Sequence, residues 1–79
     1  MARVLLFGPL RDLAGWRERE FAVASLAELR ASICADDPAL GAALAGVGVQ
    51  VALDQAIVRG EAALTAASEV AFLPPMSGG

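Results

Sequence analysis

The sequence predicts an α+β fold in which one main helix packs on a mixed sheet of four or five strands. The chain has 79 residues, which is enough for one small domain and too short for two. Short β-branched and apolar runs, separated by Gly and Pro, are typical of strands and occur near both ends of the chain. Between them lies a single longer segment with helical spacing. We find no internal repeat and no domain boundary.

The first quarter of the chain predicts two paired strands. Arg3–Phe7 is apolar and β-branched and ends at the breaker Gly8-Pro9, so it reads as a buried strand. Pro9–Ala14 is expected to form one helical turn or a wide loop. In Arg17–Val23 charged residues precede Phe21 and Val23, and these two would share one strand face with Arg17 and Arg19. The pattern predicts a partly exposed second strand paired with the first as a hairpin.

The central segment Leu26–Ala35 is predicted to be the main helix. Ser25 and Glu28 have the spacing of a capping box, in which both side chains satisfy free N–H groups at a helix start. Asp36-Asp37-Pro38 is expected to end the helix. Apolar residues recur at helical spacing within it: Leu26, Leu29 and Ile33.

The second half predicts a further short helix and a hairpin. Leu40–Ala45 can form a short helical piece. Val49–Leu53 and Ala56–Arg59 read as strands joined by a turn at Asp54-Gln55. The following segment, Gly60–Ser68, is expected to be irregular.

The composition excludes most side-chain catalysts. The chain contains no His, Lys, Tyr or Asn, so histidine triads, histidine-based zinc sites and a phosphate-loop lysine are ruled out. The single cysteine, Cys34, can form no intrachain disulfide, which fits a reducing compartment, and we expect it to be packed in the core. The carboxylate pairs Glu18/Glu20 and Asp36/Asp37 are expected to be solvated. We therefore predict neither a metal site nor an active site built from side chains.

The charge and hydropathy patterns argue against nucleic acid and membrane partners. The formal net charge is −3, which gives no reason to expect binding to phosphate backbones or anionic lipid. The longest stretch without charged side chains, Pro38–Leu53, contains three glycines. It is shorter than the ~20 apolar residues that a membrane-spanning helix needs. We expect a cytoplasmic protein.

The C-terminal end is the unusual part of the sequence. Val70–Leu73 reads as the final strand, and Pro74-Pro75 ends it because proline cannot donate to a strand ladder. No charged side chain follows Glu69, and the chain finishes with Met76-Ser77-Gly78-Gly79. Residues 74–79, if extended, could reach roughly 20 Å from a folded body of residues 1–73. Paired glycines would let the tip enter a narrow channel. The alternative is a frayed terminus.

The segment Phe72-Leu73-Pro74-Pro75-Met76-Ser77-Gly78-Gly79 resembles the C-terminal signature of the small subunit of molybdopterin synthase. This family consists of sulfur carriers with the ubiquitin-like β-grasp fold. The N-terminal run Val4–Gly15 is similar to the opening strand and turn of the family, and Leu53-Asp54-Gln55 stands where the family has a hairpin turn. Asp54 replaces an Asn that is common there, which leaves the turn geometry open.

The resemblance implies a role and a set of partners. In the family, an ATP-dependent E1-like adenylating enzyme activates the C-terminal carboxylate, here that of Gly79, and a sulfur donor system converts it to a thiocarboxylate. The tail then enters the large subunit of molybdopterin synthase and passes sulfur to cyclic pyranopterin monophosphate, which builds the molybdopterin dithiolene. Two carriers and two large subunits form a heterotetramer. The chain would thus be no enzyme by itself and would bind no cofactor, since ATP is used by the activating enzyme. The inserted residues would be Pro74, Pro75, Met76, Ser77 and Gly78.

A docking face can be expected from strand geometry. Neighbouring residues of a strand point to opposite sides, so Ile57-Val58 and Phe72-Leu73 cannot both bury their pairs in a core on one side of the sheet. One member of each pair, together with Phe7 or Leu10, is expected to form an apolar patch for a partner. A sheet covered on both sides is the alternative. The candidate partner-binding residues, including two arginines at the rim, are Phe7, Leu10, Arg11, Ile57, Arg59, Phe72 and Leu73.

Three other functions are compatible with the same features. A sulfur carrier of the thiamine-pathway type would have the same fold and the same Gly-Gly end. A ubiquitin-like protein modifier would be conjugated through Gly79 to lysines of its targets. A β-grasp interaction module would carry an inert tail.

Overall fold

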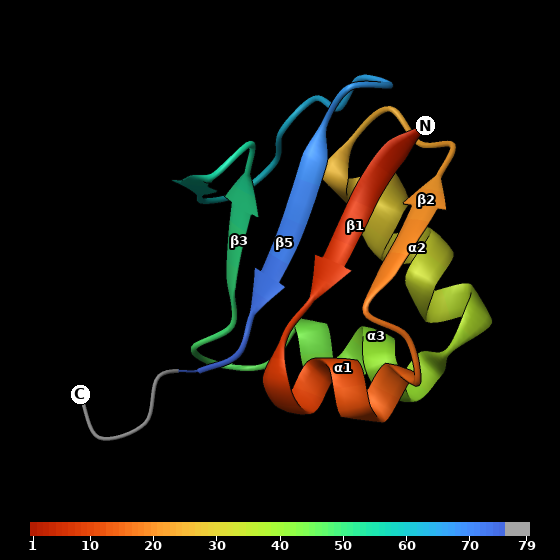
Figure 1. The fold of residues 1–79 in the computed structure, drawn as a ribbon, viewed down its shortest axis with the longest axis vertical. Helices are drawn as coiled ribbons and strands as arrows, with labels where there is room; N and C mark the ends of the chain where they lie inside the picture. Colours follow the sequence, from red (N-terminus) through yellow and green to blue (C-terminus); the bar gives the residue numbers. More distant parts are fainter. Residues whose placement is uncertain (76–79) are drawn as a thin grey trace.

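Within residues 1–75 five strands form one mixed sheet, which confirms the predicted mixed sheet of four or five strands, and the structure gives their order as β2-β1-β5-β3-β4. The computed structural model describes residues 1–75 (Figure 1). The last strand of the chain lies in the middle of the sheet, where it runs parallel to β1 and antiparallel to β3. The strand bounds are β1 Ala2–Leu6, β2 Glu18–Phe21, β3 Gln50–Leu53, β4 Ala56–Val58 and β5 Glu69–Leu73.

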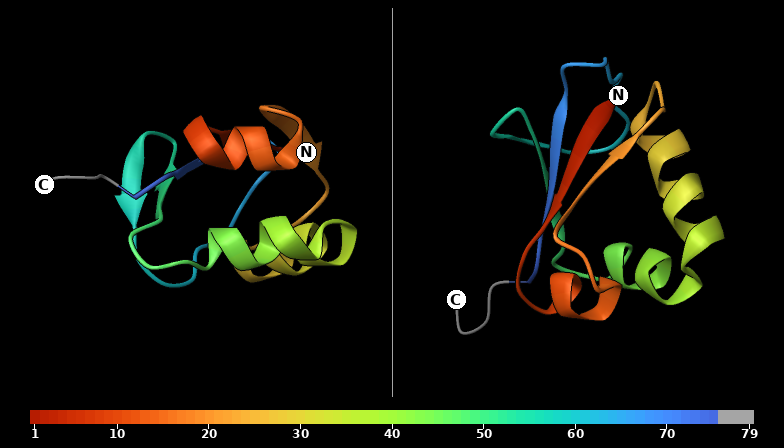
Figure 2. Two further views of the ribbon diagram at one scale, coloured as in Figure 1. Left: turned by 90° about the horizontal axis from the view of Figure 1, so that it is seen from below. Right: turned by 45° about the vertical axis from the view of Figure 1, so that its right-hand side comes forward.

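Three helices accompany the sheet: α1 Gly8–Ala14, α2 Leu26–Asp36 and α3 Pro38–Leu44. The first is a regular helix where the sequence allowed a turn or a loop, and Gly15 closes it in the left-handed conformation with φ 81°. Asp37 ends α2 and caps α3, because its side chain accepts a hydrogen bond from the N–H of Leu40. Figure 2 shows α1 across one end of the sheet, beside α3. No helix within residues 1–75 is long and apolar enough to cross a membrane.

The N-terminus of α2 has a partner for each of its four free N–H groups. Leu26 and Ala27 donate to the carbonyl of Ala62 and the carboxylate of Glu61, both from the irregular segment before β5. The next two N–H groups donate to the side chain and the carbonyl of Ser25. The predicted capping box is present in altered form, because the Glu28 carboxylate accepts from the N–H of residue 24 instead of that of the cap residue. The helix start is therefore fixed by its own sequence and by a segment 34 residues away.

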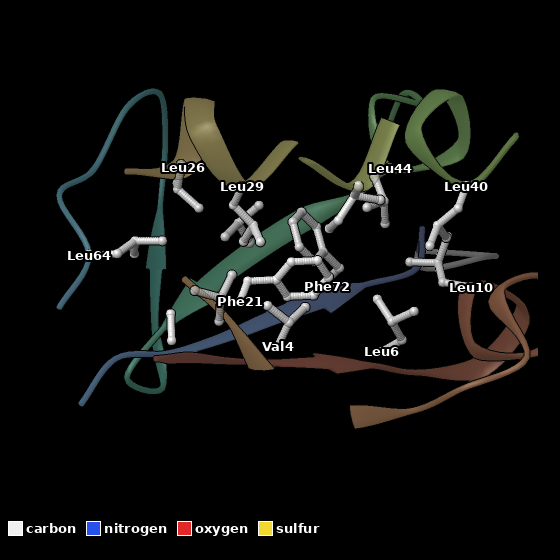
Figure 3. Close-up of a cluster of buried hydrophobic side chains, with 14 residues drawn as sticks. Val4, Leu6, Leu10, Phe21, Leu26, Leu29, Leu40, Leu44, Leu64 and Phe72 are labelled. Carbon is white, nitrogen blue, oxygen red and sulfur yellow. The ribbon is translucent and has the colours of Figure 1, made fainter. Parts of the chain in front are cut away.

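The core fills the space between one face of the sheet and helices α2 and α3 (Figure 3). Val4, Val70 and Phe72 from the two central strands are fully buried beneath Leu29 of α2. The prediction of a buried Cys34 is wrong, because its side chain is exposed. The buried side chains of α2 follow one stripe, Leu26, Leu29 and Ile33, and position 34 lies about 100° around the helix from its neighbour.

The hairpin turn at Asp54-Gln55 has the geometry that matches the twist of paired strands. Both residues have positive φ, 49° and 73°, which is the pattern of a type I′ turn. The Asp54 carboxylate accepts a hydrogen bond from the N–H of Glu69 at 2.9 Å, and the Asp54 N–H donates to the carbonyl of Glu69 at 2.8 Å. The aspartate thus ties the turn to the first residue of β5.

The cap of α2 gives a direct test of this description. We expect Ser25→Ala to lower the free energy of unfolding by about 1 kcal/mol, because the N–H of Glu28 loses its acceptor. Ser32→Ala, an exposed position within the same helix, is the matched control and should change stability by less than about 0.5 kcal/mol. Urea unfolding followed by circular dichroism measures both. Equal losses would contradict the capping role.

Candidate functional site

The candidate site begins where the chain leaves the centre of the sheet. β5 ends at Leu73, and Pro74 and Pro75 follow outside regular structure. The predicted site residues Met76, Ser77, Gly78 and Gly79 lie outside the described residues. The end of β5 lies between the end of β1 and the start of β3, because β1 is parallel to β5 and β3 is antiparallel to it (Figure 1). The tail therefore starts from the middle of the molecule and not from its edge.

The sheet has a covered face and an open face. Within residues 1–75 all three helices lie on the covered face or at the end of the sheet (Figure 2). The strand residues that alternate with the core residues direct their side chains to the open face. The register of the strands places four of these residues in one row across four strands. This row consists of Leu5, Ala71, Ala52 and Ile57, none of which belongs to the core cluster. It is apolar from β1 to β4.

Two further apolar residues extend this surface toward the tail. Leu73 follows Ala71 on the same face of β5 and is partly exposed. Phe7 has extended backbone angles, φ −130° and ψ 152°, so it continues the alternation of β1 and is 44% exposed. We name the six residues the open-face patch: Leu5, Phe7, Ala52, Ile57, Ala71 and Leu73. The patch borders the base of the tail.

The two arginines predicted at the rim lie on opposite sides of the patch. A hollow of about 260 Å³ next to β1 is lined by Leu5, Phe7 and Arg11 among others. A second hollow, of about 370 Å³, lies beside β3 and β4 and is lined by Ile57 and Arg59 among others. Ile57 is 48% exposed. Five of the seven predicted partner-binding residues are therefore accessible around the end of β5.

The other two predicted partner-binding residues belong to the core. Leu10 is only 5% exposed because α1 turns it inward against α3, where it lies close to Leu40 (Figure 3). Phe72 is fully buried, and its ring lies 5.4 Å beneath the guanidinium of Arg30. Both predictions of partner contact are wrong. Strand alternation leaves one residue of each apolar pair for a partner, and in β5 that residue is Leu73.

The opposite end of the open face is charged. Arg3 forms ion pairs with Glu69 and, at 3.8 Å, with Glu18. The hydrogen bond that Arg3 donates to the Glu69 carboxylate, followed by the negative charge of Glu18, raises the pKa of Arg3 above its ordinary value. Glu69 and Leu73 are four residues apart on β5, or about 13 Å. The open face thus changes from charged to apolar along β5, and the apolar end is the one beside the tail.

The acidic side chains and the single thiol of the described residues are dispersed over the surface. Among residues 1–75 no group of three or more Cys, Asp and Glu side chains could hold a metal ion. The carboxylate pairs that we set aside are on the surface, where Arg19 contacts Asp36 at 3.3 Å. The geometry of residues 1–75 thus combines a folded body with an apolar open-face patch and, beside it, the two prolines that follow β5.

The fold is found in solved structures of small modifier proteins. The chain aligns with SAMP1 from Haloferax volcanii at 25% sequence identity and a TM-score of 0.84, over 99% of this chain and 98% of that one. The small archaeal modifier protein 1 from Methanosarcina acetivorans aligns with a TM-score of 0.86 at 23% identity, over 99% and 95% of the two chains. The fold is therefore the ubiquitin-like β-grasp, as the resemblance implied.

The family follows from the sequence as well as from the fold. The model of the ThiS family matches residues 4–79, which include the complete tail. The chain therefore belongs to the ThiS family. No curated protein matched it at the significance that we required.

The opposite orientation of Phe72 and Leu73 in β5 can be tested by measuring how much each side chain contributes to the free energy of unfolding. Phe72→Ala should lower the free energy of unfolding by about 3–5 kcal/mol, because it leaves a cavity in the core. Leu73→Ala should cost about 1 kcal/mol, since that side chain is partly exposed. Chemical unfolding of both variants provides the comparison. Similar losses would show that the two side chains are not on opposite faces.

Proposed function

We propose that the chain is a sulfur carrier that works through the carboxylate of Gly79. The observation that carries the proposal is the exit of the chain from the central strand beside the open-face patch, in which Phe7 and Ile57 are exposed, Leu5 and Leu73 are partly exposed and the two alanines between them are buried. The match of the ThiS family extends through the Gly-Gly end, which supports a function at that end. A carrier of this kind needs two things of its own body, a surface for its partners and a tail that starts next to that surface. The open-face patch and the start of the tail beside it support the proposal on both points.

The proposed chemistry explains why the chain needs so few reactive side chains. A carboxylate is ionised at neutral pH and is a poor electrophile, so an activating enzyme must first activate it. In adenylation a carboxylate oxygen of Gly79 attacks the α-phosphorus of ATP, and pyrophosphate leaves. The terminal sulfur of a persulfide on the donor system then attacks the carbonyl carbon and displaces AMP, which gives an acyl disulfide. A second thiol of the donor system attacks the donor sulfur of this S–S bond, so that the thiocarboxylate leaves and the donor system is left with a disulfide. The carrier contributes the position of the reacting group, and its partners contribute the catalysts.

The partner that we propose is the large subunit of molybdopterin synthase, in a complex of two carriers and two large subunits. The run Phe72–Pro75 and the opening run Val4–Gly15 support this branch of the family by their resemblance to its small subunit. The thiocarboxylate would then supply the sulfur for the dithiolene of molybdopterin. The thiamine-pathway carrier remains the alternative within the same chemistry.

A protein modifier is the second candidate, and a separate observation favours it. Similarity to SAMP1 from Haloferax volcanii extends over the full length of both chains. The two functions share the activated Gly79 carboxylate and differ in the group that attacks it. Sulfur gives a thiocarboxylate, whereas the amine of a target lysine gives an isopeptide bond.

The carrier function predicts a defined change of mass. Incubation with ATP, the activating enzyme and a sulfur donor should raise the mass of the chain by the difference between one sulfur and one oxygen atom. Intact-mass and peptide mass spectrometry should locate the change in the C-terminal peptide. Deletion of Gly79 should abolish it while the far-ultraviolet circular dichroism spectrum stays the same. A chain unaltered by a competent enzyme would refute the carrier role, and isopeptide-linked adducts in cells would favour the modifier.

The open-face patch predicts where the large subunit binds. Leu73→Glu should weaken binding at least about tenfold, because it places an unpaired carboxylate in an apolar interface. Ala67→Glu adds the same charge at the opposite end of β5, at an exposed position, and should bind like the wild type. Isothermal titration calorimetry with the purified large subunit measures both. Equal affinities for the wild type and Leu73→Glu would argue against this docking face.

A further inference from the structure

Two glycines lie on either side of the prolines at the base of the tail. β1 pairs in parallel with β5, with Leu6 opposite Phe72, so two residues further along Gly8 comes opposite Pro74. β3 pairs antiparallel to β5 with Gln50 opposite Leu73, so Gly48 comes opposite Pro75 by the same count. The register of the sheet thus brings together four residues from three separate parts of the chain.

Contacts between these residues leave little room for a side chain. A Cβ atom added at Gly48 would lie 3.0 Å from the Cβ of Pro75, closer than the 3.5–4.0 Å of a normal carbon contact. At Gly8 the added atom would lie 3.4 Å from the Cγ of Pro74, which is a close but ordinary contact. Both glycines also have positive φ, 55° at Gly8 and 88° at Gly48, which other residues rarely adopt. The absence of a side chain therefore matters most at Gly48, where a methyl group would press on Pro75, and less at Gly8, where it would only touch Pro74.

The two prolines limit how the backbone can adjust to a change at this point. The ring fixes φ of each proline near −65°, and Pro75 also restricts its neighbour Pro74 to extended conformations. A proline ring cannot rotate away from a new methyl group as a flexible side chain would. A methyl group at position 48 must therefore displace Pro75 itself.

We propose that Gly8 and Gly48 are positioning residues that set the direction in which Pro74 and Pro75 leave the sheet. This inference rests on the proposed function, because it concerns how the carboxylate of Gly79 is delivered to an activating enzyme. Delivery is sensitive to small errors, since misplacement by about 1 Å can cost two orders of magnitude in rate. The glycines act through the prolines and touch no reacting group.

Four alanine variants separate contact with the tail from backbone strain. Gly48→Ala and Gly8→Ala add a methyl group against the prolines. Gly15→Ala and Gly60→Ala are matched controls, because these glycines have φ of 81° and 82° but nothing within 4 Å of the added atom. The controls carry the same strain of positive φ without the contact. Gly8→Ala also keeps the test informative if Gly48→Ala folds poorly.

The first measurement concerns the tail itself and needs no enzyme. Cys34 is exposed and is the single cysteine of the chain, so Met76→Cys gives a protein with two cysteines. A spin label on each allows the distance between positions 34 and 76 to be measured by electron spin resonance. We expect the distance distribution between labels at 34 and 76 to shift in Gly48→Ala, to shift less in Gly8→Ala and to stay unchanged in both controls. Identical distributions in Gly48→Ala and Gly60→Ala would overturn the proposal, whether or not the chain is a sulfur carrier.

The second measurement separates delivery from docking and from folding. In an ATP–pyrophosphate exchange assay with the activating enzyme, Gly48→Ala should lower kcat at least about tenfold while KM for the carrier stays within about twofold. Partial unfolding would instead raise the apparent KM and leave kcat unchanged. In a Pro75→Gly background, where the clashing Cβ is absent, Gly48→Ala should have little further effect.

The outcomes distinguish this inference from the function on which it rests. An active wild type with an equally active Gly48→Ala variant would overturn the positioning role and leave the carrier function intact. An inactive wild type would refute the carrier function, and the label distances would still decide whether the glycines direct the tail.

Discussion

The constraint on which this structure depends is that the last strand of the chain is the central strand of the sheet. β5 hydrogen-bonds to β1 on one side and to β3 on the other, so its inward side chains, Val70 and Phe72, are completely buried. The chain end must then leave from the middle of the sheet, between the ends of two neighbouring strands. A short tail that starts there is anchored to the most buried part of the core.

The side chains of β5 alternate between the two faces of the sheet, and the two faces differ in character. Phe72 stabilises the fold, and Leu73 faces outward with the apolar row that runs from β1 to β4. The charged residues of the same face lie at the far end of β5, where Arg3 pairs with Glu69. The open-face patch and the base of the tail are therefore adjacent. This arrangement suits a protein whose reacting group, in the proposed function, is its own terminal carboxylate.

Local patterns in the sequence were sufficient to predict most of the elements. The spacing of Ser25 and Glu28, the turn at Asp54-Gln55 and the proline pair after β5 each depend on neighbouring residues, and the structure contains all three features. The errors concern burial. Cys34 is exposed and Leu10 is buried, because burial depends on which side of a helix meets the sheet, and distant segments decide that.

The sequence alone determined the fold class, the absence of the common catalytic side chains and the unusual chain end. These follow from composition and from contacts between residues close in the chain. Only the tertiary structure decided which member of each apolar pair faces away from the core, and that Gly8 and Gly48 lie beside the prolines of the tail. Residues 8, 48 and 75 come together through the register of three strands. That register is set by long-range hydrogen bonds that no local pattern records.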